Sequence, residues 1–287
     1  MNKILSCIDT RGNTDAVIDW TAWAAQRLGR PVEFLHVLER HPERAESTDF
    51  SGTIGLGAQE SLLQALSEQD EQRSREAREA GRELLARARG RAAAAGLTQS
   101  DARLRHGDFV ETAIELQAEA GLFVLGEHYH ADAGQPGRRR TDHHLERVIR
   151  GVACPVLVAT ADAFEAPQRI VVAFDGSPLA RKALAALVQH PLLAGLPVQV
   201  VMVAPDTPAA RQQLQDAERT LTVAGVDAET QLVAGEPQQV LPGLVRSLGP
   251  SLLVMGAFGH SRLRQWVLGS TTATLLRLSD VPVLILR

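Results

Sequence analysis

Two clusters of glycine and hydroxyl residues near the C-terminus have the composition and spacing of a phosphate site. Gly256 and Gly259 flank Ala257-Phe258, and after nine further residues the chain reads Gly269-Ser270-Thr271-Thr272. Glycines let the backbone approach a ligand closely, and a helix starting near Ser270 would offer unpaired N–H groups and a positive dipole end. We therefore expect an anion such as phosphate to bind here. Taken singly, these residues are also typical of a strand-end turn and a serine helix cap.

Strands and helices must alternate to position these clusters. Short β-branched runs alternate with longer amphipathic segments through the second half, which predicts crossover units and a parallel sheet. Five strands are expected, at Ile170–Phe174, Val198–Val203, Thr230–Val233, Leu252–Met255 and Val283–Leu286. Helical spacing covers Leu179–Gln189, Ala209–Ala224, Gln238–Leu248 and Thr271–Leu278. Because the strands read as continuous apolar runs, both faces of the sheet should be covered, which gives a three-layer α/β/α domain.

The second half repeats the first with a shift of 166 positions. In this register Lys3 falls on Arg169, Asp9 on Asp175 and Val37 on Val203. A repeat of half the chain is far longer than a solenoid unit, so each half should be a domain with its own core. The expected fold is therefore two tandem Rossmann-like α/β domains, residues 1–163 and 168–287, each with a five-stranded, mostly parallel sheet.

Composition limits the function classes. The 287 residues carry a formal net charge of -4 and two cysteines, and no apolar run reaches membrane-spanning length. Neither a nucleic acid nor a membrane is expected as the main partner, and the location expected is cytoplasmic. Lys3 and Lys182 are the only lysines, and neither stands in a Gly-Lys-Ser/Thr sequence. P-loop ATPase chemistry is therefore excluded.

The glycine spacing at 256, 259 and 269 resembles the signature of the universal stress protein family. An Asp after the first strand, a Val at the end of the second and a final strand of the Val-Pro-Val-Leu type are further landmarks of that family, and all are present in the second half. The resemblance covers nearly the whole chain and identifies a tandem member. It implies the fold of the wider adenine-nucleotide α/β group and a site for ATP.

The resemblance assigns roles to residues of the second half. Asp175 matches the residue that contacts adenosine, and Val203 the position whose backbone contacts the adenine edge. Asp175 could also be a plain turn residue before Gly176. The remaining matches would form the floor of the site and contact the phosphates and ribose. They are Met255, Gly256, Gly259, Gly269, Ser270 and Thr272, and the neighbouring His260 and Thr271 are added to the candidate site. No carboxylate in the motif is placed to hold a divalent ion, so any Mg²⁺ would bind through phosphates and water.

Three functions are consistent with such a site. The first is an ATP-binding stress protein that acts as a nucleotide-dependent sensor or adaptor. The second is a slow ATPase that uses the same site, although no nucleophile or paired carboxylates can be named around it. The third is a flavin or electron-transfer protein, which would be yellow. The first is the favoured hypothesis.

The first half has diverged at the corresponding loop. Tyr129 stands where the second glycine is expected, and Asp142, His143 and His144 replace Gly269 and the two residues after it. A carboxylate there would repel a triphosphate, so we expect this half to have lost ATP binding. His128, His130 and His143 could hold Zn²⁺, but the spacing fits no firm metal signature, and a polar surface loop is the favoured interpretation.

The first half also carries an insertion, and both halves end in an apolar strand. An insertion at about His41 to Ala58 precedes a charged surface helix from about Gln59 to Ala95. The final strands of the halves, 154–159 and 281–286, are apolar and would lie at sheet edges, where unpaired strands invite pairing. In the family such strands pair between subunits, so the tandem chain should form an intramolecular pseudo-dimer, and that unit could in turn form a homodimer.

Overall fold

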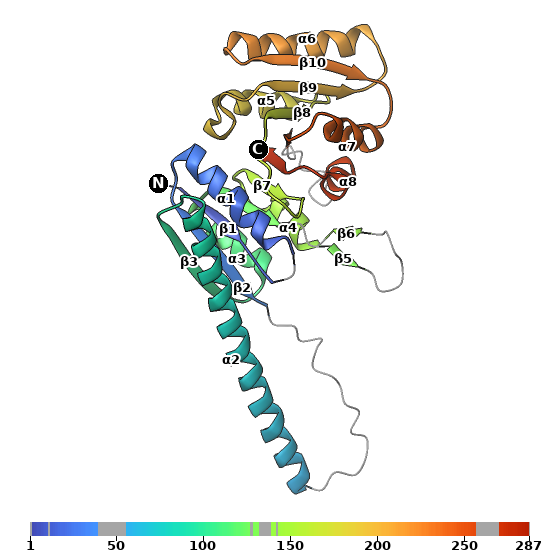
Figure 1. Cartoon of the computed structure of the whole chain (residues 1–287). Coiled ribbons are helices and arrows are strands. Elements are labelled where there is room, and N and C mark those ends of the chain that lie inside the picture. The colour runs from blue at the N-terminus through green and yellow to red at the C-terminus, as the bar shows by residue number, and fades with distance from the viewer. Residues whose placement is uncertain are drawn as a thin grey trace.

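The chain folds into two α/β halves joined through one sheet, as Figure 1 shows. The computed structural model describes residues 2–10, 12–39, 56–126, 129–131, 139–141, 143–256 and 270–286. The first half contains β1 (Lys3–Cys7), α1 (Thr14–Leu28), β2 (Val32–Leu38), α2 (Leu56–Ala94), β3 (Ser100–His106), α3 (Phe109–Leu116), β4 (Ala120–Gly126), β5 (Tyr129–Ala131), β6 (Arg139–Thr141), α4 (His143–Gly151) and β7 (Val156–Ala159). The second contains β8 (Arg169–Ala173), α5 (Pro178–Gln189), the 3₁₀ turn η2 (Pro191–Leu193), β9 (Val198–Val203), α6 (Pro208–Val223), β10 (Ala228–Val233), α7 (Pro237–Ser247), β11 (Ser251–Gly256), α8 (Ser270–Leu278) and β12 (Val283–Leu286).

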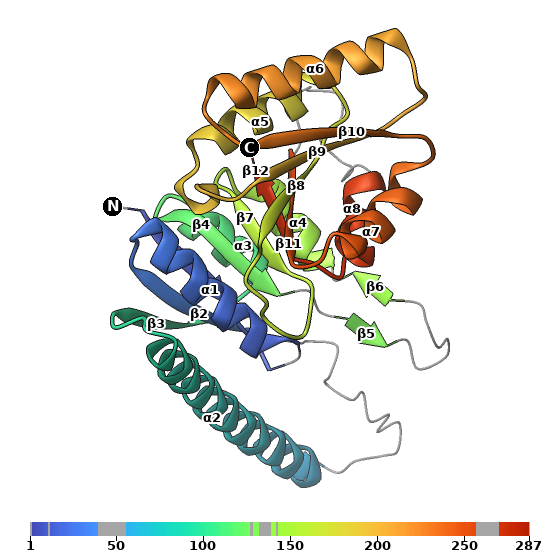
Figure 2. The same ribbon diagram turned by 45° about the horizontal axis from the view of Figure 1, so that its top comes forward.

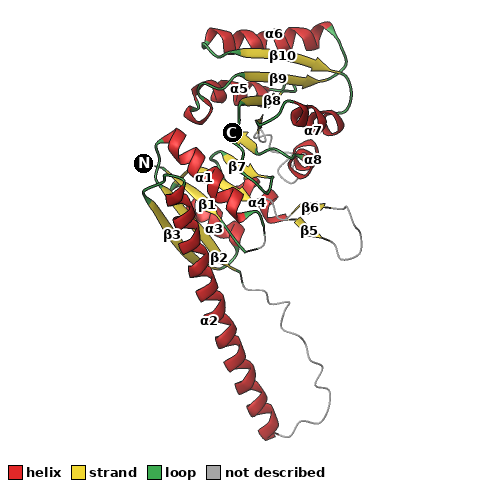
Figure 3. Cartoon of the chain, in the orientation of Figure 1, coloured by secondary structure: helices red, strands yellow, loops and turns green. Residues whose placement is uncertain are grey.

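Both halves have the same strand order. The ten-stranded sheet runs β10-β9-β8-β11-β12-β7-β4-β1-β2-β3, so each half orders its own strands 3-2-1-4-5 and pairs them in parallel. The expected tandem α/β/α fold is confirmed. The short hairpin of β5 and β6, visible in Figure 3, was not predicted from the sequence, and its second strand contacts helix α8 of the other half.

The sequence repeat reappears in the backbone hydrogen bonds. Ile4 N–H donates to Pro31 O at 2.9 Å, and Ile170 N–H donates to Pro197 O at the same distance. The last strands also match, because Phe123 N–H donates to Pro155 O and Leu253 N–H to Pro282 O, both at 3.0 Å. The shift of 166 positions therefore relates equivalent strand pairs at the start of each half. Pro155 and Pro282 stand at equivalent places before the final strands.

The last strands of the two halves pair with each other. β12 and β7 run antiparallel, with Leu284 opposite Leu157. Each is the edge of its own five-stranded sheet, as expected, and their pairing removes both edges. Antiparallel pairing also turns the halves around, so the carboxyl ends of their strands point in opposite directions.

Helices cover both faces of the sheet (Figure 2). One core packs α1, α2, α5 and α6 against one face, and the other packs α3, α4, α7 and α8 against the opposite face. Successive residues of a strand alternate between them, since Ile4 lies in the first core and Leu5 in the second, both fully buried. This explains why the strands read as unbroken apolar runs.

Local sequence sets the helix ends of the second half. Ser177 and Thr207 accept hydrogen bonds from the backbone N–H of Ala180 and Ala210, both at 3.1 Å, and proline follows each of them at the first helical position. A hydroxyl cap followed by proline is a strong helix start because the proline removes an N–H that would have no partner. In the first half, α1 ends at Leu28 and is capped by Gly29, whose left-handed φ of 59° suits glycine.

Helix α2 spans 39 residues, close to the expected Gln59–Ala95. Its first part projects away from the rest of the molecule in Figure 1, and its last part packs against α1, β2 and β3. It is long but polar. Within the described residues no helix combines the length and apolar character needed to cross a bilayer.

Candidate functional site

Three neighbouring strands of the second half end where the sequence predicts a ligand. Asp175 follows β8, Val203 ends β9, and Met255 and Gly256 end β11, and the three strands are adjacent in the order β9-β8-β11. The helix after β8 packs on one face of the sheet and the helix after β11 on the other. In open α/β sheets, the carboxyl ends of the strands at a point where the connections diverge in this way are the usual position for a ligand.

Asp175 lies exposed at this edge. Its Oδ1 accepts a hydrogen bond from Ser177 N–H at 2.9 Å, which fixes the turn between β8 and α5. Gly176 is buried in this turn with φ of 71°, and a Cβ there would lie 2.1 Å from Oε1 of Gln213 on α6. Asp175 therefore stabilises a turn in this structure, and it uses Oδ1 for this hydrogen bond.

Gly256 has a packing role that the sequence did not reveal. An added Cβ would lie 3.2 Å from the carbonyl oxygen of Leu179 and 3.2 Å from Cβ of Ala183, both on α5. Such distances are tighter than ordinary contact, so glycine lets β11 and α5 approach closely. Before it, Met255 is 5% exposed and packs in the core, while Val203 on β9 is half-buried.

The predicted phosphate end is described in part. Helix α8 begins at Ser270, and Thr272 is half-buried in its first turn. Because β12 runs parallel to β11, the chain between them must return along the sheet, which puts the start of α8 on the carboxyl side with Asp175 and Gly256. Gly259, His260 and Gly269 lie outside the described residues, as does the side chain of Thr271.

The first half holds a carboxylate at the equivalent edge. Glu39 directly follows β2, and its Oε1 accepts a hydrogen bond from Phe109 N–H at the start of α3, at 3.2 Å. The same oxygen lies 3.3 Å from Nδ1 of His144 in the first turn of α4, the helix equivalent to α8. This contact was not predicted from the sequence. Its only sequence signal was an acidic residue immediately after a buried strand.

The histidines proposed for zinc are only partly described. His128 lies outside the described residues, His130 is in β5 and His143 is the first residue of α4, and nothing is described of their side chains. Among the residues whose side chains are described, no group of three or more metal-ligating side chains lies together. Among the described side chains the structure thus gives the zinc hypothesis no support.

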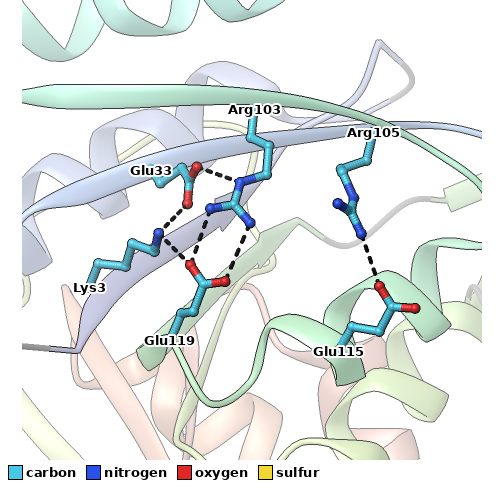
Figure 4. A network of polar contacts seen from close by, with 6 residues as sticks. All are labelled: Lys3, Glu33, Arg103, Arg105, Glu115 and Glu119. Atoms are coloured by element: carbon cyan, nitrogen blue, oxygen red, sulfur yellow. Dashed lines mark hydrogen bonds and ion pairs between the residues drawn. The ribbon is translucent and has the colours of Figure 1, made fainter.

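The densest charge cluster described lies elsewhere, around the start of β1. Lys3 Nζ lies 2.7 Å from Glu33 and 2.7 Å from Glu119, and Arg103 pairs with the same two carboxylates at 2.7 and 3.1 Å (Figure 4). Burial alone would lower the pKa of Lys3, but its hydrogen bonds to Glu119 and Glu33 raise it. Hydrogen bonds from Lys3 and Arg103 lower the pKa of Glu119. The charges of this cluster are paired with one another, which is typical of a structural network.

The fold defines a class: two doubly wound α/β domains in tandem. The universal stress protein family model matches residues 1–160 and again residues 167–287. A universal stress protein from Synechocystis is 31% identical over 293 residues, which covers 100% of both chains. The chain belongs to the universal stress protein family.

Two solved structures share the whole fold. A universal stress protein from Archaeoglobus fulgidus covers 100% of this chain and 98% of its own, with a TM-score of 0.73 and 18% identity. A functionally unknown protein from Pseudomonas aeruginosa covers 100% of this chain and 92% of its own, with a TM-score of 0.62 and 16% identity. At these identities the likeness concerns the fold, and it extends over both halves.

Proposed function

We propose that the second half binds one adenine nucleotide, ATP, at the carboxyl edge of β9, β8 and β11, and that the protein is a nucleotide-dependent sensor or adaptor. The observation that carries this proposal is the convergence of Asp175, Val203, Gly256 and the start of α8 at the point where the helix connections diverge. The family resemblance assigns ATP contacts to these same positions.

Each group has a chemical role in the proposed site. The carboxylate of Asp175 accepts hydrogen bonds from hydroxyl or amino groups of the nucleoside, and the half-buried Val203 lies beside the base. The first N–H groups of α8 have no partner within the helix, so they donate to phosphate oxygens. Mg²⁺, where present, binds through the phosphates and water.

The first half is proposed not to bind nucleotide. The carboxylate of Glu39 lies 3.3 Å from His144 at the start of α4, where the second half would hold phosphate. A phosphate brought to that helix would meet a negative charge already in place. Like charges placed next to each other in a partly buried site cost several kcal/mol.

The test is the nucleotide content of freshly purified protein, followed by calorimetric titration of ATP into protein stripped of nucleotide. We expect a stoichiometry of one per chain. Gly269→Glu adds a carboxylate at the phosphate position and should weaken ATP binding at least about 100-fold, since like charges repel there by several kcal/mol. Asp142→Asn, at the equivalent position of the first half, is the control and should leave affinity unchanged.

Release of inorganic phosphate from the same samples separates binding from hydrolysis. ATP recovered intact after many hours supports a sensor or adaptor, whereas repeated turnover that Gly269→Glu abolishes would establish the slow ATPase instead. A stoichiometry of two, or no binding at all, would contradict the proposal.

A further inference from the structure

The first part of helix α2 stands away from the rest of the molecule. From residue 66 to residue 80 the helix exposes every side chain except Ser74, which is half-buried, and Gly81 is the first buried position. At Gly81 the helix meets the body, because an added Cβ would lie 2.9 Å from Leu104 and 3.0 Å from His36. We call residues 56–80 the outer arm. At 1.5 Å per residue it is about 37 Å long.

Where its side chains are described, at residues 64 and 66–80, the outer arm has little to stabilise it within the chain. Its described side-chain contacts are local pairs one turn apart, Gln64 with Glu68, Gln72 with Glu76 and Arg75 with Glu71. Each such pair contributes only about 0.2–0.5 kcal/mol, and an isolated solvated helix is marginal in water. Leu66 is nevertheless 46% exposed on this arm. A covering partner would account for both observations.

The arm carries the spacing of a coiled-coil seam. Positions 63, 66, 70, 73, 77 and 80 follow one another at alternating steps of three and four residues, and they read Leu, Leu, Asp, Arg, Ala and Ala. These positions share the face of the helix that holds the a and d residues of a coiled coil, and on this arm that face is apolar at both ends and charged in the middle. The polar pair in the middle would be costly against an apolar partner, so it indicates a partner with complementary charges at the same height.

The residues along this face of one outer arm are complementary to those of a second arm that runs in the opposite direction. In an antiparallel pair centred between residues 71 and 72, position 63 of one copy falls at the height of position 80 of the other, and Leu66 lies opposite Ala77. Asp70 then lies opposite Arg73, twice by symmetry. A single surface that matches its own reverse is what a two-fold symmetric dimer requires.

The charges along the arm agree with this arrangement. Residues 56–72 hold four acidic and no basic side chains, whereas residues 73–82 hold four arginines and two glutamates. Antiparallel pairing brings the acidic stretch of one copy beside the basic stretch of the other. Parallel pairing would bring like charges together, which is unfavourable.

We propose that the outer arm is a dimerisation element, and that its partner is the outer arm of a second copy of this chain, packed antiparallel along residues 63–80. The apolar layers lie at the two ends of the contact and the Asp70–Arg73 pairs at its centre. This contact is separate from the β7–β12 pairing, which lies within one chain, and it is independent of nucleotide binding.

The test is the mass in solution as a function of concentration, measured by sedimentation or light scattering. From about 1 to about 200 μM, the wild type should rise from the chain mass of 31.0 kDa towards twice that value. Asp70→Arg and Arg73→Asp should each remain at the chain mass, because each places two like charges opposite one another. An equimolar mixture of the two variants should regain the doubled mass, since opposite charges again face each other.

The matched control is Glu68→Arg. Glu68 lies on the side of the helix opposite the seam, so this variant should dimerise like the wild type despite the same change in net charge as Asp70→Arg. Circular dichroism should show equal helix content in the four proteins. A wild type that stays at the chain mass up to about 200 μM overturns the proposal. So does a dimer that survives both seam variants, which would assign association to another surface such as the exposed edges of β3 and β10.

Discussion

Asp175 and Asp9 hold equivalent places after the first strand of each half, yet only the second half is proposed to bind nucleotide. Asp175→Ala should weaken ATP binding about 10-fold or more, because a hydrogen bond to a charged group contributes about 1.5–3 kcal/mol. Asp9→Ala is the matched control and should leave the affinity unchanged. Calorimetric titration of both variants gives the comparison. Equal losses in the two would mean that both halves bind, and no loss in either would remove Asp175 from the site.

Glu119 gives a prediction on pH. Lys3 and Arg103 lower the pKa of Glu119 in the folded protein, so its contribution to stability is fully present above the ordinary glutamate pKa of about 4.3 and is lost as pH falls through the lowered value. Because its side chain is 44% exposed, Glu119→Gln should cost only about 0.5–1 kcal/mol at pH 7.

Urea unfolding at several pH values measures this effect. The difference between wild type and Glu119→Gln should shrink as the pH falls below about 4, since the wild-type carboxylate then becomes neutral. Glu115→Gln, which breaks the single exposed pair with Arg105 at 2.9 Å, is a control with a smaller expected loss. A difference that stays constant from pH 7 to pH 3 would contradict the role assigned to Glu119.

At the scale of elements, the contact between α5 and β11 depends on Gly256. Gly256→Ala places a Cβ 3.2 Å from Leu179 O and from Ala183 Cβ, so we expect a loss of about 1–3 kcal/mol in the free energy of unfolding. Gly243→Ala is the matched control, because Gly243 is exposed within α7 and nothing lies within 4 Å of its added Cβ. It should stabilise by about 0.5–1 kcal/mol through helix propensity. Denaturant unfolding would refute the assignment if both substitutions were neutral.

The sequence predicted the boundaries of helices more reliably than it predicted short strands that pair with each other. The predicted helices 179–189 and 209–224 are observed at 178–189 and 208–223, because Ser177-Pro178 and Thr207-Pro208 start them by local hydrogen bonding. The β5–β6 hairpin was missed. Its strands are three residues each, and such short strands give no alternating pattern to read.

At the scale of the whole molecule, the β7–β12 pairing makes one sheet of two domains. Leu284 is fully buried between Val254 of its own half and Leu157 of the other, so Leu284→Ala should cost about 2–5 kcal/mol. Because the strand is shared, faster hydrogen exchange should appear in β4 as well as in β11.

Leu221→Ala provides the control for this coupling. Leu221 is equally buried, but it lies on α6, which packs against β9 and β10 away from the junction. Its exchange effect should stay in the second half. If Leu284→Ala also left exchange in β4 unchanged, the halves would be energetically independent despite their shared sheet.

The sequence alone determined the tandem repeat and the strand and helix types, and it predicted the sheet edge proposed for the ligand, because these depend on periodicity and on residues a few positions apart. Tertiary structure decided what depends on distant residues meeting. It placed Gly256 against α5 and brought Glu39 to His144 at the start of α4, and it set the antiparallel register of the β7–β12 pairing that the apolar final strands predicted. No local pattern encodes these contacts, since each joins segments that lie together only after the helices have packed on the sheet.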